Sequence, residues 1–141
     1  MWDLLTPGIL LGSIEAMKYL LKTPKKIFIN YASSYENDVE RFIKRGSLLS
    51  ADVEAFELEL IKEPRLGVVV QGTGGLRKVR LKSATSGKRG GFRVCYYYYV
   101  IKSKIVLIAI YGKNEQDDLT QDERRKFRKI IDGLKREDSD E

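Results

Sequence analysis

Histidine is absent from the 141-residue sequence, and cysteine occurs only once, at Cys95. Without histidine the chain cannot form the usual serine-hydrolase or Cys-His catalytic sets, a histidine-ligated zinc site or a histidine-pair ribonuclease centre. A single cysteine excludes an intrachain disulfide and a thiolate metal cluster, and we expect it to be a small core residue. This composition fits a reducing, cytoplasmic location.

Long apolar runs are also missing. The N-terminal stretch GILLGSIEAMKYLL is interrupted by Ser13, Glu15 and Lys18, and falls short of the roughly 18 apolar residues that cross a bilayer. It also lacks the basic region and small-residue cleavage site of a signal peptide. We therefore expect no membrane association. Residues 1–24 contain no pattern that ties them to the rest of the chain, and Met17 is a second candidate start, so we interpret them as an N-terminal extension with one amphipathic helix.

Carboxylates are absent from residues 66–114, although this segment contains ten lysines and arginines. The other 92 residues hold 16 cations and all 20 carboxylates, so the formal net charge of +6 arises within one contiguous segment. Solubility alone would be served by mixed signs, and a stretch of this kind indicates a polyanionic partner, most often nucleic acid. An acidic lipid surface fits less well, because this segment has the pattern of strands and not of a basic amphipathic helix.

Two helices follow a first short strand at residues 25–30 (KKIFIN). The first begins near Ser33 or Ser34, either of which is the expected N-cap, and ends at Gly46. The second begins after Ser50 and is limited by Pro64. Apolar residues recur at helical spacing in both, at Tyr35, Val39, Phe42 and Ile43 in the first, and at Val53, Phe56, Leu60 and Ile61 in the second.

Strand patterns replace the helical periodicity after Pro64. The GTGG turn at residues 72–75 precedes the alternating run LRKVRLK, and residues 92–100 and 104–111 form two further strands joined by a short turn. We expect these last two to pair as an antiparallel hairpin. The order is β-α-α-β-β-β-α, which predicts an α+β domain over residues 25–136.

The final helix is predicted from a Thr-x-x-Glu capping box at Thr120 and Glu123. Its apolar residues lie on one face: Phe127, Ile130, Ile131 and Leu134. Residues 137–141 (EDSDE) form an acidic tail that we expect to be solvated and frayed.

Alternation along strands places the cations relative to one another. Lys78, Arg80 and Lys82 should share one face, with Arg77 on the other. The next strand carries aromatic residues on both faces, with Arg93 and Cys95 on the same side. The intervening loop SATSGKRGG is glycine-rich and basic. We expect it to bring Lys88 and Arg89 near phosphate, and we expect Arg77 and Lys82 to add further contacts to RNA.

Simpler interpretations account for several of these features. Four successive tyrosines, residues 96–99, are good strand-forming material whose hydroxyls reach water or a partner. The glycines fit turns, because the strand-GxxxxGK[ST]-helix order of a phosphate-binding loop is missing. A single cation is usually only a solvated charge. The joint placement of cations on neighbouring strands is what favours a binding surface.

Catalysis without histidine would depend on lysine, arginine and tyrosine. No acidic cluster lies near the glycine-rich loop, so two-metal phosphodiester cleavage is disfavoured and we expect neither metal nor cofactor. These side chains suit RNA, whose 2′-hydroxyl is an internal nucleophile beside the scissile phosphate. Arginine can stabilise the dianionic phosphorane. Lysine or tyrosine would handle protons, although their ordinary pKa values near 10 make them poor bases unless dense positive charge lowers the lysine values.

Three segments resemble the HigB-type branch of the RelE/ParE toxin superfamily: PRLGVVVQGTGGLRKVRL, GKRGGFRVCYYYYV and LIAIYGKNEQDDLT with its final basic helix. The glycine-rich turn, the RGG-x-R segment and the YGKNE strand end occur in the family's order and spacing. The resemblance covers residues 25–136. It implies a compact antiparallel sheet with two N-terminal helices packed on one face and a C-terminal helix. It further implies a toxin that cleaves messenger RNA in the A site of the 70S ribosome, leaving a 2′,3′-cyclic phosphate and a 5′-hydroxyl, and a helix-turn-helix, HigA-like antitoxin.

The resemblance also assigns roles to residues. Lys78 and Arg80 match paired basic positions that grip the RNA backbone in relatives, and Arg93 matches an arginine that contacts the scissile phosphate. Tyr111 and Lys113 lie near the strand end where relatives keep a catalytic residue. With no histidine available, Lys78 is the candidate general base, and Lys113 or Arg80 the group that assists the leaving oxygen. Tyr111, or a tyrosine of residues 96–99, could stack on a base.

Two other functions stay open on the sequence alone. A ParE-like gyrase inhibitor would share the fold without needing an RNA-cleaving set, and the paired basic positions with Arg93 argue against it. A non-catalytic RNA-binding module would use the same cations only to contact phosphates, so that each loss would weaken binding modestly and flatten its salt dependence.

Overall fold

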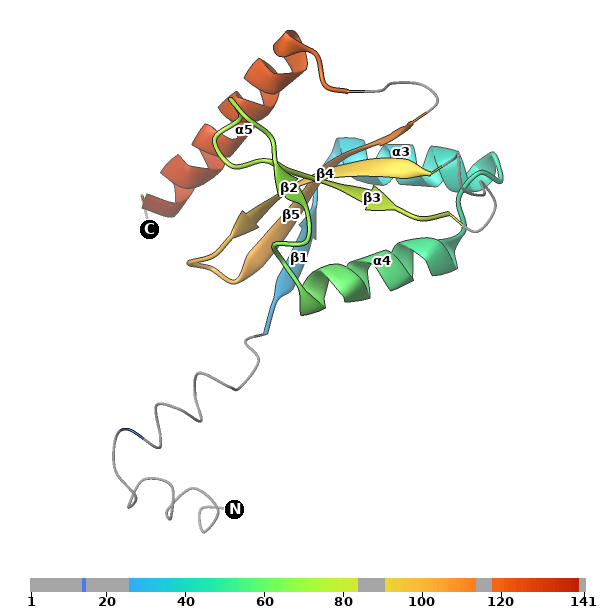
Figure 1. The fold of residues 1–141 in the computed structure, drawn as a ribbon, viewed down its shortest axis with the longest axis horizontal. Coiled ribbons are helices and arrows are strands. Elements are labelled where there is room, and N and C mark those ends of the chain that lie inside the picture. Colours follow the sequence, from blue (N-terminus) through green and yellow to red (C-terminus); the bar gives the residue numbers. More distant parts are fainter. Residues whose placement is uncertain (1–13, 15–25, 84–90, 114–117, 140–141) are drawn as a thin grey trace.

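The computed structural model describes residues 14, 26–83, 91–113 and 118–139 (Figure 1). Apart from Ile14, the predicted extension therefore lies outside the described residues. The elements are β1 (Phe28–Tyr31), α3 (Ser33–Lys44), α4 (Ser50–Lys62), β2 (Val68–Val69), β3 (Arg77–Leu81), β4 (Phe92–Tyr99), β5 (Lys104–Gly112) and α5 (Gln121–Ser139).

Five strands form one sheet in the order β1-β5-β4-β3-β2, which confirms the α+β class and the β4–β5 hairpin. The prediction of an antiparallel sheet was wrong at one edge, because β1 runs parallel to β5. The chain reaches β5 from β1 only after both helices and three other strands, so no hairpin constrains their direction. The sequence also missed β2, whose two valines pair with Arg77 and Lys78.

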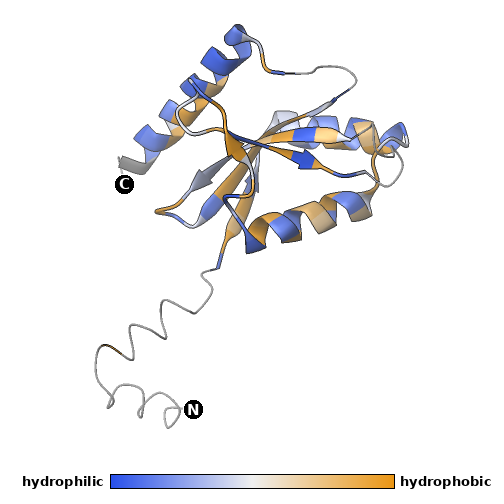
Figure 2. Ribbon diagram, viewed as in Figure 1, coloured by the Kyte–Doolittle hydropathy of each residue, from blue (hydrophilic) through white to orange (hydrophobic). Residues whose placement is uncertain are grey.

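Two hydrophobic clusters lie on opposite faces of the sheet. Helices α3 and α4 cover one face, where Phe42, Leu60 and Tyr96 are fully buried. Helix α5 covers the other, where Ile131 packs near Cys95 and Ile108. Figure 2 shows hydrophobic residues concentrated in the strands and hydrophilic residues over much of α5. Among the described residues, no helix combines the length and the apolar character that a membrane crossing requires.

The start of α3 differs from the expected serine cap. Its N-cap is Ala32, which has no side chain able to accept a hydrogen bond, and the Ser34 hydroxyl instead donates to the carbonyl oxygen of Ile108 at 3.1 Å. The Ser34 hydroxyl, which the sequence predicted as a cap of the helix, therefore bonds to β5 instead. The predicted stop is confirmed, because Gly46 follows the helix with φ of +76°, a conformation that glycine adopts without strain.

Helix α5 begins as predicted. The backbone N–H of Thr120 donates to the Glu123 carboxylate at 2.9 Å, and the N–H of Glu123 donates to the Thr120 hydroxyl at 3.1 Å. On its predicted apolar face Ile131 is fully buried, whereas Ile130 is 44% exposed. The helix continues to Ser139 and so includes the first three residues of the predicted acidic tail.

Strand β4 is the centre of the sheet and is covered on both faces. It pairs with β3 on one side and with β5 on the other. A bulge interrupts the second pairing, because Cys95 pairs with Ala109 while Tyr96 pairs with Leu107, leaving Ile108 as an extra residue. On the α3–α4 face the Tyr96 hydroxyl accepts from the backbone N–H of Gly67 and donates to the carbonyl of Pro64, both at 2.8 Å.

We predict that Tyr96→Phe lowers the free energy of unfolding by about 1–3 kcal/mol, because it leaves the buried N–H of Gly67 without an acceptor. Tyr98→Phe is the matched control. It makes the same change two residues along the strand, at a hydroxyl without a hydrogen bond to the described part of the chain, and should change stability by less than about 0.5 kcal/mol. Urea unfolding of both variants measures the difference, and equal stability would contradict the role given to Tyr96.

Candidate nucleic-acid interface

Three neighbouring strands bring Arg80, Arg93 and Tyr111 into one row. Arg80 on β3 lies opposite Arg93 on β4, and Arg93 lies opposite Tyr111 on β5. Residues directly opposite one another in a ladder project from the same face, here the face that α5 covers. Lys78 lies two residues before Arg80 and therefore on the same face. Residues up to 33 positions apart in the sequence, Lys78 and Tyr111, therefore lie on one face of the sheet.

Polar atoms at the centre of this row are buried without partners. The Nη1 atom of Arg93 and the hydroxyl of Tyr111 are inaccessible to solvent and have no hydrogen-bond partner among the described residues. Buried polar atoms are normally hydrogen-bonded, so each donor left without a partner has a cost. An anion that accepts hydrogen bonds from both groups would remove this cost, and a phosphate is such an anion.

Tyr111 is held in its protonated form. Burial raises the pKa of Tyr111 to about 12, with Cys95 and Asp118 adding to the shift and the Arg93 charge opposing it. The phenol is therefore a hydrogen-bond donor at neutral pH and not a base.

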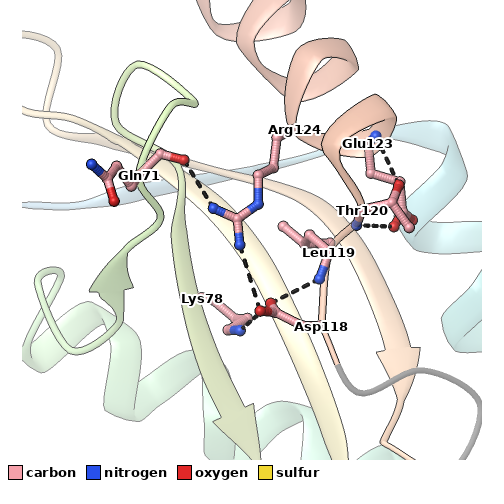
Figure 3. Close-up of polar contacts among 7 residues, drawn as sticks. All are labelled: Gln71, Lys78, Asp118, Leu119, Thr120, Glu123 and Arg124. Carbon is pink, nitrogen blue, oxygen red and sulfur yellow. Dashed lines mark hydrogen bonds and ion pairs between the residues drawn. The ribbon is translucent and has the colours of Figure 1, made fainter.

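Lys78 has a carboxylate partner that the sequence analysis did not foresee (Figure 3). Its Nζ atom lies 2.9 Å from Oδ1 of Asp118. The hydrogen bond from Lys78 is the largest cause that lowers the pKa of Asp118, followed by the hydrogen bond from the Leu119 backbone N–H. The segment without carboxylates ends at residue 114, and Asp118 folds back onto it from four residues beyond. The structure therefore gives Lys78 a partner at the candidate site, and its expected role as general base stays a prediction.

Arg124 is a second residue that the sequence did not single out. It lies in the first turn of α5, where its Nη2 atom is 3.5 Å from Oδ2 of Asp118 and its Nη1 atom donates to the carbonyl of Gln71 at 3.2 Å (Figure 3). One arginine thereby joins α5 to the turn before β3. The only sequence signal was its position immediately after the capping box, which places it at the beginning of the helix beside residue 118.

The other predicted cations are dispersed. Lys113 is exposed just past β5, and its backbone N–H donates to the carbonyl of Gly91 at 3.2 Å. Lys82 is exposed after β3 and lines a pocket of about 380 Å³ together with Arg80 and residues of α4. Lys88 and Arg89 lie outside the described residues.

Arg77 lies on the opposite face of β3, as alternation required. Its guanidinium donates to the carbonyl of Gly67 at 2.6 Å and to that of Arg65 at 3.4 Å. These bonds hold the chain that enters β2, so its position gives no support to the expected contact with RNA. We leave Arg77 out of the proposed site.

Cys95 is a buried core residue, as expected. It lies opposite Lys78 in the ladder and belongs to the hydrophobic cluster under α5. Burial raises the pKa of its thiol to about 12, so it is not a nucleophile at neutral pH.

Comparisons with known proteins place the chain in a family. Residues 37–140 match the family described as the RelE toxin of the RelE/RelB toxin-antitoxin system. Among solved structures, a double arginine-to-alanine mutant of the E. coli toxin RelE in the free state is similar at 16% identity and a TM-score of 0.47, covering 66% of this chain and 90% of that one. The intact E. coli RelBE toxin-antitoxin complex contains a chain similar at 17% identity and a TM-score of 0.44, covering 60% of this chain and 93% of that one. The family match spans more than half of the sequence, and this chain therefore belongs to the RelE toxin family of type II toxin-antitoxin systems.

Proposed function

We propose that this RelE-family toxin is a HigB-type, ribosome-dependent endoribonuclease that cleaves messenger RNA in the ribosomal A site. Its proposed regulator is a cognate helix-turn-helix, HigA-like antitoxin. The observation that carries the proposal is the row of Arg80, Arg93 and Tyr111 on one face of three strands, with Lys78 beside it. The buried, unpartnered atoms of Arg93 and Tyr111 support a phosphate as the ligand.

The proposed reaction is an internal transfer at phosphorus. The RNA 2′-oxygen attacks the adjacent phosphate, a bond from 2′-oxygen to phosphorus forms, and the bond to the 5′-oxygen of the next nucleotide breaks. The 2′-hydroxyl proton passes to water, and the leaving 5′-oxygen receives a proton. The products are a 2′,3′-cyclic phosphate and a 5′-hydroxyl, so atoms balance without a metal or cofactor.

Each side chain has a role that follows from its surroundings. Arg93 donates to the phosphoryl oxygens, whose negative charge grows in the transition state, and Arg80 adds a second cation from the next strand. Tyr111 stays protonated and donates a hydrogen bond to the same group. Lys78, which pairs with the Asp118 carboxylate, is the proposed donor to the leaving oxygen. Lys113, exposed just past β5, is the alternative proposed group that assists the leaving oxygen.

Dependence on the ribosome fits this set of residues. A site without histidine has no group that ordinarily exchanges protons near pH 7, so catalysis must rely on orientation and charge stabilisation. A codon held in the A site supplies an RNA strand whose backbone is already restrained. Free RNA would have to be ordered by the toxin alone, at a further entropic cost.

We predict that Arg93→Lys lowers the cleavage rate on programmed ribosomes by about a hundredfold to a thousandfold, because lysine keeps the charge but loses the planar fork of donors. Arg125→Lys is the matched control, because it makes the same substitution at an exposed arginine of α5, and this variant should cleave at the wild-type rate. The measurement is the mapping of new RNA 5′ ends, with ribosome-bound and free messenger RNA compared in parallel. A cleavage rate for Arg93→Lys near that of wild type would refute the catalytic assignment. Absence of cleavage by wild type, with salt-sensitive RNA binding retained, would favour the binding module and direct the next assay to gyrase.

We further predict that Tyr111→Phe slows cleavage about tenfold or more without changing the shape of the pH–rate profile between pH 6 and 9. Because the pKa of Tyr111 is raised to about 12, its phenol stays protonated across this range. Removing the hydroxyl therefore removes a hydrogen-bond donor but no group that titrates between pH 6 and 9. Single-turnover rates at several pH values test this. Loss of a limb of the profile in the variant would show that Tyr111 titrates and serves as the base.

A further inference from the structure

A groove of about 430 Å³ lies between α3 and α4, on the face of the sheet opposite the nucleic-acid interface. Its apolar lining includes the rings of Tyr31 and Tyr35 and the side chain of Val39, and its acidic lining includes Glu36, Glu40 and Glu57. On α3 the lining residues run from Tyr35 to Lys44, which corresponds to a length of about 13 Å at 1.5 Å per residue. A groove of this length accommodates about two turns of a partner helix and exceeds what a single small amine would fill.

The groove is acidic on a chain whose formal net charge is +6. Its lining holds three glutamates against one cation, Lys44. Lys44 lies 2.9 Å from Glu40, so that pair is neutral as a whole. Glu36 and Glu57 then give the groove a net negative charge, which repels RNA and acidic lipid and attracts a cationic side chain.

The two tyrosines carry a second, independent indication of a ligand. Their rings stack with centroids 6.1 Å apart, and the Tyr31 hydroxyl donates to the Glu57 carboxylate. Tyr35 is only 2% exposed, and its hydroxyl has no hydrogen-bond partner within the described ranges. An aromatic face beside carboxylates is the usual environment of a bound guanidinium or ammonium group. The Tyr35 oxygen can accept one further N–H from such a group.

We propose that this groove binds an arginine-bearing or lysine-bearing helical segment of the antitoxin. The cation lies against the Tyr31 ring and pairs with Glu36 and Glu57, while apolar residues of the same segment cover Val39. This inference rests on the proposed function, which supplies the antitoxin as the partner. It assigns that partner a surface remote from the RNA-cleaving row, so the two ideas are tested by different readouts.

The test uses the full-length toxin and its proposed cognate antitoxin, with affinity measured by titration calorimetry at two salt concentrations. We expect Glu36→Gln with Glu57→Gln to weaken binding at least tenfold and to flatten its salt dependence. Tyr35→Phe keeps the charge and removes only the acceptor, and should weaken binding about threefold to tenfold. Glu54→Gln with Glu63→Gln is the matched control, because it removes two exposed carboxylates of the α4 region that do not line the groove.

Cleavage of ribosome-bound messenger RNA by the same variants separates the two proposals. Groove variants should cleave at the wild-type rate and resist the antitoxin. If wild type never cleaves but binds the antitoxin through the groove, the proposed function fails and this inference stands. Unchanged affinity in the Glu36 and Glu57 variant overturns the inference. If the same variant also loses self-association, the groove binds a second copy of this chain. If deletion of residues 1–24 changes the affinity for the antitoxin as much as the Glu36 and Glu57 variant does, the groove is assigned to this chain's own N-terminal segment, and the inference is again overturned.

Discussion

The register of β4 between β3 and β5 is the constraint on which the rest of the structure depends. One alignment places Arg93 beside Arg80 and Tyr111, and the same alignment directs Tyr96 into the opposite core. A slip of one residue would exchange the faces, turning the arginine toward α3 and α4 and the tyrosine toward α5. The aromatic run that fills the core therefore also fixes the geometry of the candidate site. Packing and function are coupled through a single strand.

Electrostatics in the site is set by few groups because histidine is absent. Among the described residues, the Nη1 atom of Arg93 and the hydroxyl of Tyr111 are buried without hydrogen-bond partners, whereas Lys78 pairs with Asp118, which also contacts Arg124. In this part of the chain, donors without partners lie at the centre of the row and paired charges lie at its edge. Such an arrangement is organised before an anion arrives, and preorganised donors are the main means by which a site without a good base stabilises a phosphorane.

The two faces of the sheet have opposite electrostatic character. The α5 face of the strands carries Lys78, Arg80 and Arg93, while the groove between α3 and α4 presents Glu36 and Glu57 beside stacked tyrosines. A basic protein that also carries an acidic groove can engage two partners of opposite charge without competition for one surface. The proposed antitoxin contact is therefore a consequence of how the acidic helices are placed relative to the basic strands.

The sequence by itself determined the helices, the hairpin and the face shared by Lys78 and Arg80, because these follow from local periodicity, capping and alternation. That Arg93 projects from the same face was decided by the register between β3 and β4. It could not determine that β1 runs parallel at the sheet edge, or that Ser34 bonds to β5, because long-range pairing leaves no local pattern. The ion pair of Lys78 with Asp118 was also hidden. A count of charges along the chain cannot show which residues lie side by side. Only the tertiary structure brings the Asp118 carboxylate to Lys78 on the basic strand.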